Sequence, residues 1–344
     1  MAKRHAAENT GMILATANET ALTIAPISWV WFVGAVLTFL ALDLGVFHRK
    51  AHAVGFREAL MWTTIWFSMA MVFAFWLAPM MVGDWGADQS KLFVTGYVVE
   101  LSLSMDNVFV IALIFSYFRV PLEYQHRVLF WGILGALVMR AAMILGGAGL
   151  IQQFHWILYL FGAFLLFSGI KMLFVGDEEV EPEKNIVIRL ARRIYPVATE
   201  FDSHHFFTQL NGRRALTPLA LCLIMVETTD LIFAVDSIPA IFGITTDSFI
   251  IFTSNVFAIL GLRSLYFVLV GLLQHFCYLK YGLALVLVFI GFKMLIVLWG
   301  SRPGWLNFED NHDSVLIIVA AILGLSIVAS LFARKKEPEE TGEK

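Results

Sequence analysis

Long apolar runs alternate with short polar segments along nearly the whole of this 344-residue chain. Each run is about 20 residues long, the length an α-helix needs to cross the roughly 30 Å hydrocarbon core of a membrane. Nine such runs occupy residues 27–47, 60–82, 92–116, 128–150, 155–175, 216–242, 249–273, 280–299 and 315–333. The pattern therefore predicts an all-α, polytopic membrane protein with nine transmembrane helices.

Positive charge is distributed unevenly over the polar segments. If every run crosses the membrane, Lys3, Arg4, Lys91 and Arg302 fall on one side, and sixteen other Lys and Arg residues fall on the opposite side. Cytoplasmic loops are the ones rich in Lys and Arg. Residues 1–26 are therefore expected outside the cytoplasm, with the charged loop 176–215 and the tail 334–344 inside it. The first 26 residues do not read as a signal peptide, so the first run is predicted to remain a membrane helix.

Composition agrees with this class and excludes several others. The chain is 59% hydrophobic and 15% charged, its mean hydropathy is +0.77, and its net charge of −3 does not favour a nucleic-acid partner. Its two cysteines, Cys222 and Cys277, cannot form a disulfide framework, a thiolate zinc site or a CxxC pair. HExxH, phosphate-binding glycine loops and GxSxG are absent from the sequence. We therefore predict no enzyme and no organic cofactor.

Two stretches of three runs each repeat one another. ELSLSMDNVFV, beginning at Glu100, matches DLIFAVDSIPA, beginning at Asp230; Arg140 matches Arg263, and GIKML at 169–173 matches GFKML at 291–295. Because each unit has an odd number of spans, the second would be inverted in the membrane, as in many secondary transporters. The predicted division is 1–26, a first helix pair 27–82, repeat one 83–175, loop 176–215, repeat two 216–299, a last helix 300–333 and tail 334–344.

Five acidic residues lie inside the predicted helices: Glu100, Asp106, Glu227, Asp230 and Asp236. A carboxylate at the centre of a membrane helix costs about 2.5–3.5 kcal/mol, or roughly 15 kcal/mol for five. The buried arginines Arg140 and Arg263 leave an excess of three negative charges, with Lys171 and Lys293 expected to extend outward to the membrane surface. A divalent cation and one proton would cancel this excess. A salt-bridge network that only fixes helix packing is the alternative.

Helical spacing groups these acids with other oxygen-bearing residues. Glu100, Ser104 and Asn107 share one helix face, and Glu227, Asp230, Ala234 and Ser237 share another. Asp106 and Asp236 lie off these faces, although a helix break at Pro239 would turn Asp236 inward. Asp43 and Asn255 are additional candidates. Oxygen ligands suit magnesium, calcium or manganese.

These motifs make the chain resemble the TerC/Alx family of membrane proteins, within the wider LysE-like transporter group. The resemblance rests on residues 100–110, 227–242, 254–267 and 281–296 and extends from about residue 27 to 299. It implies manganese(II) export across the bacterial inner membrane, with related members tied to tellurium resistance or to metal supply for secreted enzymes. It also implies a metal path lined by Glu100, Asp106, Asn107, Glu227, Asp230, Asp236 and Ser237.

Other functions stay open at this point. Metal ions, protons and the lipid bilayer are the expected partners, and a homo-oligomer is not excluded by the sequence. Paired aspartates on two helices are also found in intramembrane aspartyl proteases, but the GxGD signature is absent. A membrane assembly or metal-loading factor would instead bind a protein through loop 176–215. His204 and His205 in that loop are candidates for metal sensing, although adjacent loop histidines are usually solvated.

Overall fold

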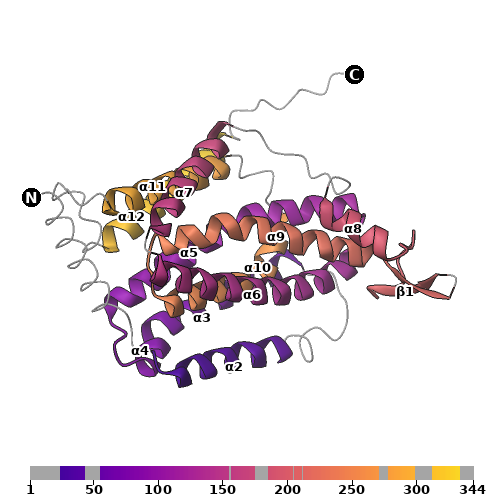
Figure 1. Cartoon of the computed structure of the whole chain (residues 1–344), viewed down its shortest axis with the longest axis horizontal. Helices are drawn as coiled ribbons and strands as arrows, with labels where there is room; N and C mark the ends of the chain where they lie inside the picture. The colour runs from indigo at the N-terminus through magenta and orange to yellow at the C-terminus, as the bar shows by residue number, and fades with distance from the viewer. Residues whose placement is uncertain are drawn as a thin grey trace, which may run out of the picture.

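The computed structural model describes residues 24–42, 55–154, 156–174, 185–203, 205–210, 212–270, 278–298 and 312–333. Long helices make up most of these residues (Figure 1). They are α2 (Pro26–Leu42), α3 (Phe56–Val72), which continues through the π-helical turn η2 (Phe73–Leu77) into α4 (Ala78–Met81), α5 (Ala87–Tyr117), α6 (Leu122–Gln153), α7 (Ile157–Phe174), α9 (Pro218–Phe242), α10 (Ser248–Val270), α11 (Leu279–Leu298) and α12 (His312–Ala333). The shorter elements are α8 (Ile186–Ile194), β1 (Phe207–Leu210) and β2 (Arg213–Leu216).

Two of the long helices begin at residues whose side chains cap them. The Thr217 hydroxyl accepts a hydrogen bond from the Ala220 amide at 3.3 Å, and Pro218 occupies the first turn of α9, where no amide donor is needed. The Asp247 carboxylate accepts from the amides of Phe249 and Ile250 at 2.9 and 3.0 Å before α10. Local sequence therefore sets where these helices start.

Eight helices in the described part of the chain are long and apolar enough to cross a membrane. They coincide with the second to ninth predicted runs, α3, η2 and α4 counting as one span. The first predicted run appears as the shorter apolar helix α2, and residues 43–47 of that run lie outside the described residues. The all-α polytopic membrane fold predicted from the sequence is confirmed.

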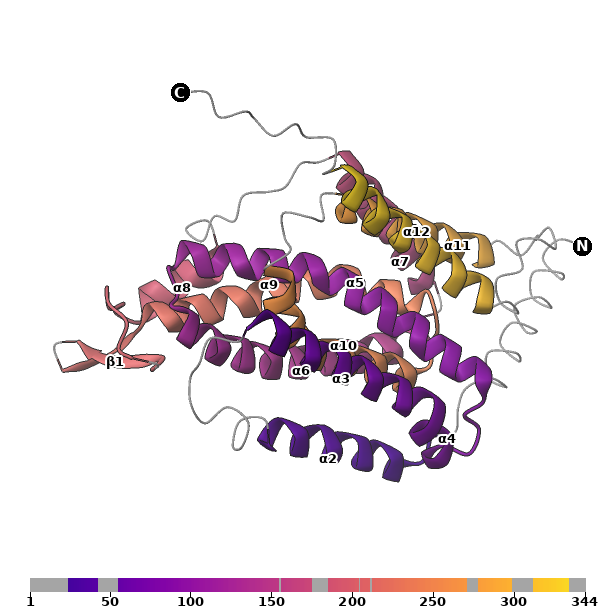
Figure 2. The ribbon, with the colours of Figure 1, turned by 180° about the vertical axis from the view of Figure 1, so that it is seen from behind.

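The helices form two groups (Figures 1 and 2). In the larger group α10 packs against α3, α5 and α6, while α9 packs against α5 and α6. Most residues of α10 are buried, so this helix lies at the centre of the group. The smaller group contains α7, α11 and α12, is inclined to the first, and contacts it through α5 and α9.

The third helices of the two predicted repeats, α7 and α11, meet at glycines. A Cβ on Gly169 would lie 2.9 Å from backbone atoms within 284–288, and a Cβ on Gly291 would lie 2.7 Å from a backbone atom within 162–166. Gly169 therefore contacts the part of α11 that lies three to seven residues before Gly291. In the same way, Gly291 contacts the part of α7 that lies three to seven residues before Gly169. Such reciprocal contacts are expected for two helices related by a two-fold axis, and they support the inverted repeat, which stays a prediction.

Segment 176–215, predicted as a charged loop, contains a helix and two strands. Asn185 caps α8 by accepting from the amides of Val187 and Ile188 at 2.8 and 3.2 Å, and the buried Ile188 attaches the helix to α9. Strands β1 and β2 then form an antiparallel hairpin that leads into α9. Helix α8 is only nine residues long, too short to stand out as an apolar run.

Candidate functional site

One face of α5 presents three polar side chains to the protein interior. Glu100, Ser104 and Asn107 are 0%, 1% and 3% exposed. They follow the spacing i, i+4, i+7 that places residues on one side of a helix. Asp106 lies off this face and is only half-buried. The sequence spacing therefore assigned these side chains correctly.

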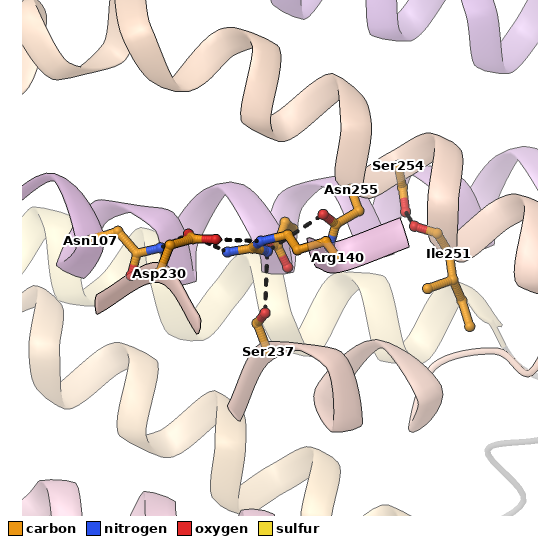
Figure 3. Close-up of polar contacts among 8 residues, drawn as sticks. Asn107, Arg140, Asp230, Ser237, Ile251, Ser254 and Asn255 are labelled. Carbon is orange, nitrogen blue, oxygen red and sulfur yellow. Dashed lines mark hydrogen bonds and ion pairs between the residues drawn. The ribbon is translucent and has the colours of Figure 1, made fainter. Parts of the chain in front are cut away.

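Arg140 of α6 is the centre of the polar cluster (Figure 3). Its guanidinium is 2% exposed and forms ion pairs with Glu100 of α5 and Asp230 of α9. The pair with Asp230 is two-pronged, because Nη2 donates to Oδ1 at 3.0 Å and Nε donates to Oδ2 at 3.3 Å. Planar, two-pronged pairing of this kind is a property of arginine that lysine lacks. One arginine therefore joins the matching acids of the two repeats.

Amide and hydroxyl groups complete the cluster. Asn107 Nδ2 donates to Asp230 Oδ1 at 3.2 Å, so α5 and α9 are linked directly. Arg140 Nη1 also donates to Ser237 Oγ at 3.3 Å and to Asn255 Oδ1 at 3.5 Å (Figure 3). The stripe of Asp230 and Ser237 on α9 thus faces Arg140 as its spacing predicted. Asn255, considered only as an additional candidate, belongs to the cluster.

Several buried polar atoms in this cluster have no hydrogen-bond partner within the described residues. They are Glu100 Oε2, Ser104 Oγ, Asn107 Oδ1 and Asn255 Nδ2. A buried polar atom left unpaired costs about 1–3 kcal/mol, and in a native protein it is explained by strain, by a catalytic role, or by a bound water or ion. Three of the four are oxygens on the buried face of α5. They could serve as ligands for a cation once the acids are free to bind it.

Glu227 lies one helical turn before Asp230 and reaches the surface of α6. A Cβ on Gly135 would overlap Glu227 Oε1, so only glycine leaves room for the carboxylate in this position. No hydrogen bond or ion pair to Glu227 is formed within the described part of the chain. Gly135 could not be found from the sequence, because nothing marks which glycine of α6 will face an acid from α9.

Asp236 lies elsewhere, and the expected helix break that would have turned it inward is absent. Helix α9 runs through Pro239 to Phe242. Proline in the last turn removes a single backbone hydrogen bond, which the packed helix tolerates. Asp236 therefore stays off the Arg140 face and accepts a hydrogen bond from Ser168 Oγ of α7 at 2.9 Å. Lys171 of α7 is exposed, as expected, and acts on Asp236 electrostatically.

Lys293 and Arg263 also differ from expectation. Lys293 does not extend outward: it is 7% exposed and donates to the Gly243 carbonyl at the end of α9 at 3.1 Å. Counting Lys293 as buried reduces the excess of negative charge from three to two. Arg263 lines a small pocket beside Phe39 of α2, Trp66 of α3 and other residues. It therefore occupies a different setting from its counterpart Arg140.

In the described residues no three acidic, histidine or cysteine side chains gather as a ready-made metal site. Two of the five acids, Glu100 and Asp230, instead meet around a guanidinium. Asp43 and His204 fall outside the described residues, and His205 lies in the turn before β1, where Nδ1 is 3.2 Å from the Asp202 carbonyl oxygen. The cluster around Arg140 is thus the best candidate for the functional site.

Comparison with known proteins identifies the family. The model of the integral membrane protein TerC family matches residues 85–338, which include every residue of the Arg140 cluster. The chain belongs to the TerC family.

Its relatives match over almost their full length. An uncharacterized membrane protein of Myxococcus xanthus is 50% identical over 317 residues, covering 91% of this chain and 95% of that protein. Alx of Escherichia coli K12, whose name proposes a membrane-bound redox modulator, is 50% identical over 308 residues, covering 88% and 92%. An uncharacterized membrane protein of Rickettsia bellii is 38% identical over 302 residues, covering 88% and 99%. No solved structure matches the chain.

Proposed function

We propose that this TerC-family protein is a secondary transporter that exports a divalent cation, manganese(II), across the bacterial inner membrane in exchange for protons. The observation that carries the proposal is the set of buried, unpaired oxygens on α5 beside two acids from different repeats. Ionisable groups inside membrane helices usually mark substrate or ion pathways. The family resemblance supplies manganese as the ion, since oxygen ligands alone suit magnesium and calcium equally.

The proposed ligands divide into a centre and two flanks. Glu100, Asn107, Asp230 and Ser237 lie together around Arg140 and form the centre. Asp106 and Asp236 lie on other faces of the same helices, and we assign them to the path by which the ion enters or leaves. Glu227 stands beside the centre, one turn from Asp230. This arrangement fits transporters in which the site lies between two repeats.

Exchange for protons follows from the negative charge that remains inside the membrane after the metal is released. With Lys293 counted, the excess of two negative charges equals the charge of one divalent ion. Once the ion departs, carboxylates inside the membrane have no countercharge and are costly. Protonation removes that cost, so a proton gradient directed inward favours export. From the charge distribution of the loops we infer that the N-terminal segment lies outside and segment 176–215 in the cytoplasm.

Flux measurements in proteoliposomes test the proposal. Manganese uptake or release would be followed with an enclosed metal-sensitive dye, with and without a pH gradient, for wild type and Asp230→Asn. We expect the gradient to accelerate wild-type flux and the substitution to abolish it. Asp88→Asn is the matched control, because Asp88 is 68% exposed at the start of the same helix α5 that carries Glu100. Wild-type flux indistinguishable from empty liposomes would refute the proposal.

A membrane assembly or metal-loading partner is the second candidate. Helix α8 and the hairpin support it, because Ile186, Ile194 and Phe207 are 74%, 62% and 59% exposed in a segment assigned to the cytoplasmic side. Absence of flux together with metal transfer to a co-purified protein would favour this function. An aspartyl protease fits poorly, since Glu100 and Asp230 meet through a guanidinium and do not share a proton. The redox role in the name of Alx has no cysteine pair to support it in the described residues.

A further inference from the structure

Arg140 occupies the place that a transported cation needs. All three guanidinium nitrogens are engaged, Nη1 by Glu100, Ser237 and Asn255, and Nη2 and Nε by Asp230. Three of these four partners are residues proposed as metal ligands. A divalent cation and a guanidinium cannot share these oxygens, because two positive charges at such short range repel strongly in a medium of low dielectric constant.

We propose that Arg140 is a tethered competitor of the metal: it holds the acids in the metal-free protein and must leave the site before the metal can bind. The inference rests on the proposed function and adds the mechanism by which the two acids keep a positively charged partner after the metal has left. Release of the metal then becomes an exchange, in which the returning guanidinium takes over Glu100 and Asp230. Without it, two buried carboxylates would face each other with no cation between them, a costly arrangement.

Glu227 gives the displaced guanidinium a partner. Its carboxylate lies against Gly135, five residues before Arg140 on the same helix, and no described contact engages it. Five residues along a helix correspond to about 7.5 Å, a distance that the long arginine side chain can span. Arg140 would thus move along α6 from Asp230 to Glu227, one turn away on α9. With the metal bound, Arg140 compensates Glu227. Without the metal, Arg140 is shared by Glu100 and Asp230, and the two negative charges that remain are met by the exchanged protons.

Equilibrium binding of Mn²⁺ to the purified protein in lipid nanodiscs tests the proposal, with free Mn²⁺ measured by its electron paramagnetic resonance signal. Arg140→Gln removes the competing charge and is expected to tighten Mn²⁺ binding about tenfold or more. It should also slow turnover, because release is no longer assisted. Arg263→Gln, the same change at the matching position of the other repeat, should leave the affinity within about twofold. Affinity of Arg140→Gln equal to or weaker than wild type would overturn the proposal.

Chemical rescue separates competition from a structural role. In Arg140→Ala, added guanidinium ion should weaken Mn²⁺ binding, whereas methylammonium at the same concentration should not, since it lacks the planar fork. Wild type should respond to neither. If the neutral variants do not fold, Arg140→Lys keeps the charge without two-pronged pairing and should still bind Mn²⁺ several-fold more tightly than wild type. Wild-type affinity in Arg140→Lys, or no selective effect of guanidinium, would refute the competition.

A double-mutant cycle tests whether the displaced Arg140 side chain pairs with Glu227. If Glu227 receives the displaced arginine, Glu227→Gln weakens Mn²⁺ binding in wild type but not in Arg140→Gln. Equal weakening in both backgrounds would show that Glu227 is a metal ligand and would remove it from the exchange. Failure of the proposed function looks different, because no variant, wild type included, would then bind Mn²⁺. If wild type binds and transports Mn²⁺ but Arg140→Gln does not bind it more tightly, the exchange with Arg140 is refuted and the proposed transport function is not.

Discussion

Alanine at Gly169 tests the contact between α7 and α11. Its Cβ would lie 2.9 Å from both the Ala284 carbonyl oxygen and the Val288 amide nitrogen, atoms that no rotamer change can move. The two helices would have to separate. Overpacking of this kind costs typically about 1–3 kcal/mol, and contact with backbone places the expected loss at about 2–3 kcal/mol. Gly291→Ala meets the backbone of α7 in the same way and should cost the same amount.

The assay is reversible unfolding of the purified protein in mixed micelles, with the free energy of unfolding compared between variants. Gly146→Ala is the control, because no atom lies within 4 Å of a Cβ at that position of α6. It should be neutral or stabilising by up to about 1 kcal/mol, the difference in helix propensity between alanine and glycine. Equal effects at Gly169 and Gly146 would refute the close approach of the helices. A loss at Gly169 but not at Gly291 would refute the two-fold relation.

Three further predictions concern the site and its surroundings. Gly135→Ala displaces the flexible end of Glu227 rather than backbone, so Mn²⁺ affinity measured in nanodiscs should change while the unfolding free energy stays within about 1 kcal/mol of wild type. Ser168→Ala removes the hydrogen bond to Asp236 and should cost about 0.5–1.5 kcal/mol in the same unfolding assay, with a smaller loss of flux than Asp236→Asn. A spin label on Leu190→Cys, at a position 54% exposed on the apolar face of α8, should be relaxed by lipid-soluble oxygen more than by a polar nickel chelate if α8 lies at the membrane surface.

Helices and their polar faces were predictable from sequence because both are local properties. An apolar run of about 20 residues defines a span regardless of what surrounds it. The spacing of Glu100, Ser104 and Asn107 defines a face for the same reason, and all three side chains are buried. Asp230 and Ser237 follow the same rule on α9. For these residues the periodicity of the helix was sufficient to predict which side chains share a face.

Several features of the site could not be predicted from the sequence and became clear only from the structure. The repeat treated Arg140 and Arg263 as equivalents, yet only the packing of α6 against α5 and α9 shows that Arg140 joins both acids. Lys293 was expected at the membrane surface, but the end of α9 offers it a carbonyl. Pro239 was expected to break α9, although its position in the last turn makes the lost hydrogen bond tolerable. The outcomes for Arg140 and Lys293 depend on neighbours that are distant in sequence, whereas that for Pro239 depends on its place in the helix.

The difference between Arg140 and Arg263 also bears on mechanism. A site with exact two-fold symmetry would hold its two acids equivalently, so a cation would have no preferred order in which to contact them. Here Asp230 is bound by two guanidinium nitrogens and by Asn107, whereas Glu100 contacts one nitrogen and keeps Oε2 unpaired. In the proposed exchange, an arriving cation would therefore meet an available oxygen on α5 before it displaces Arg140 from α9. The order of these steps follows from the asymmetry that packing imposes on the repeated sequence.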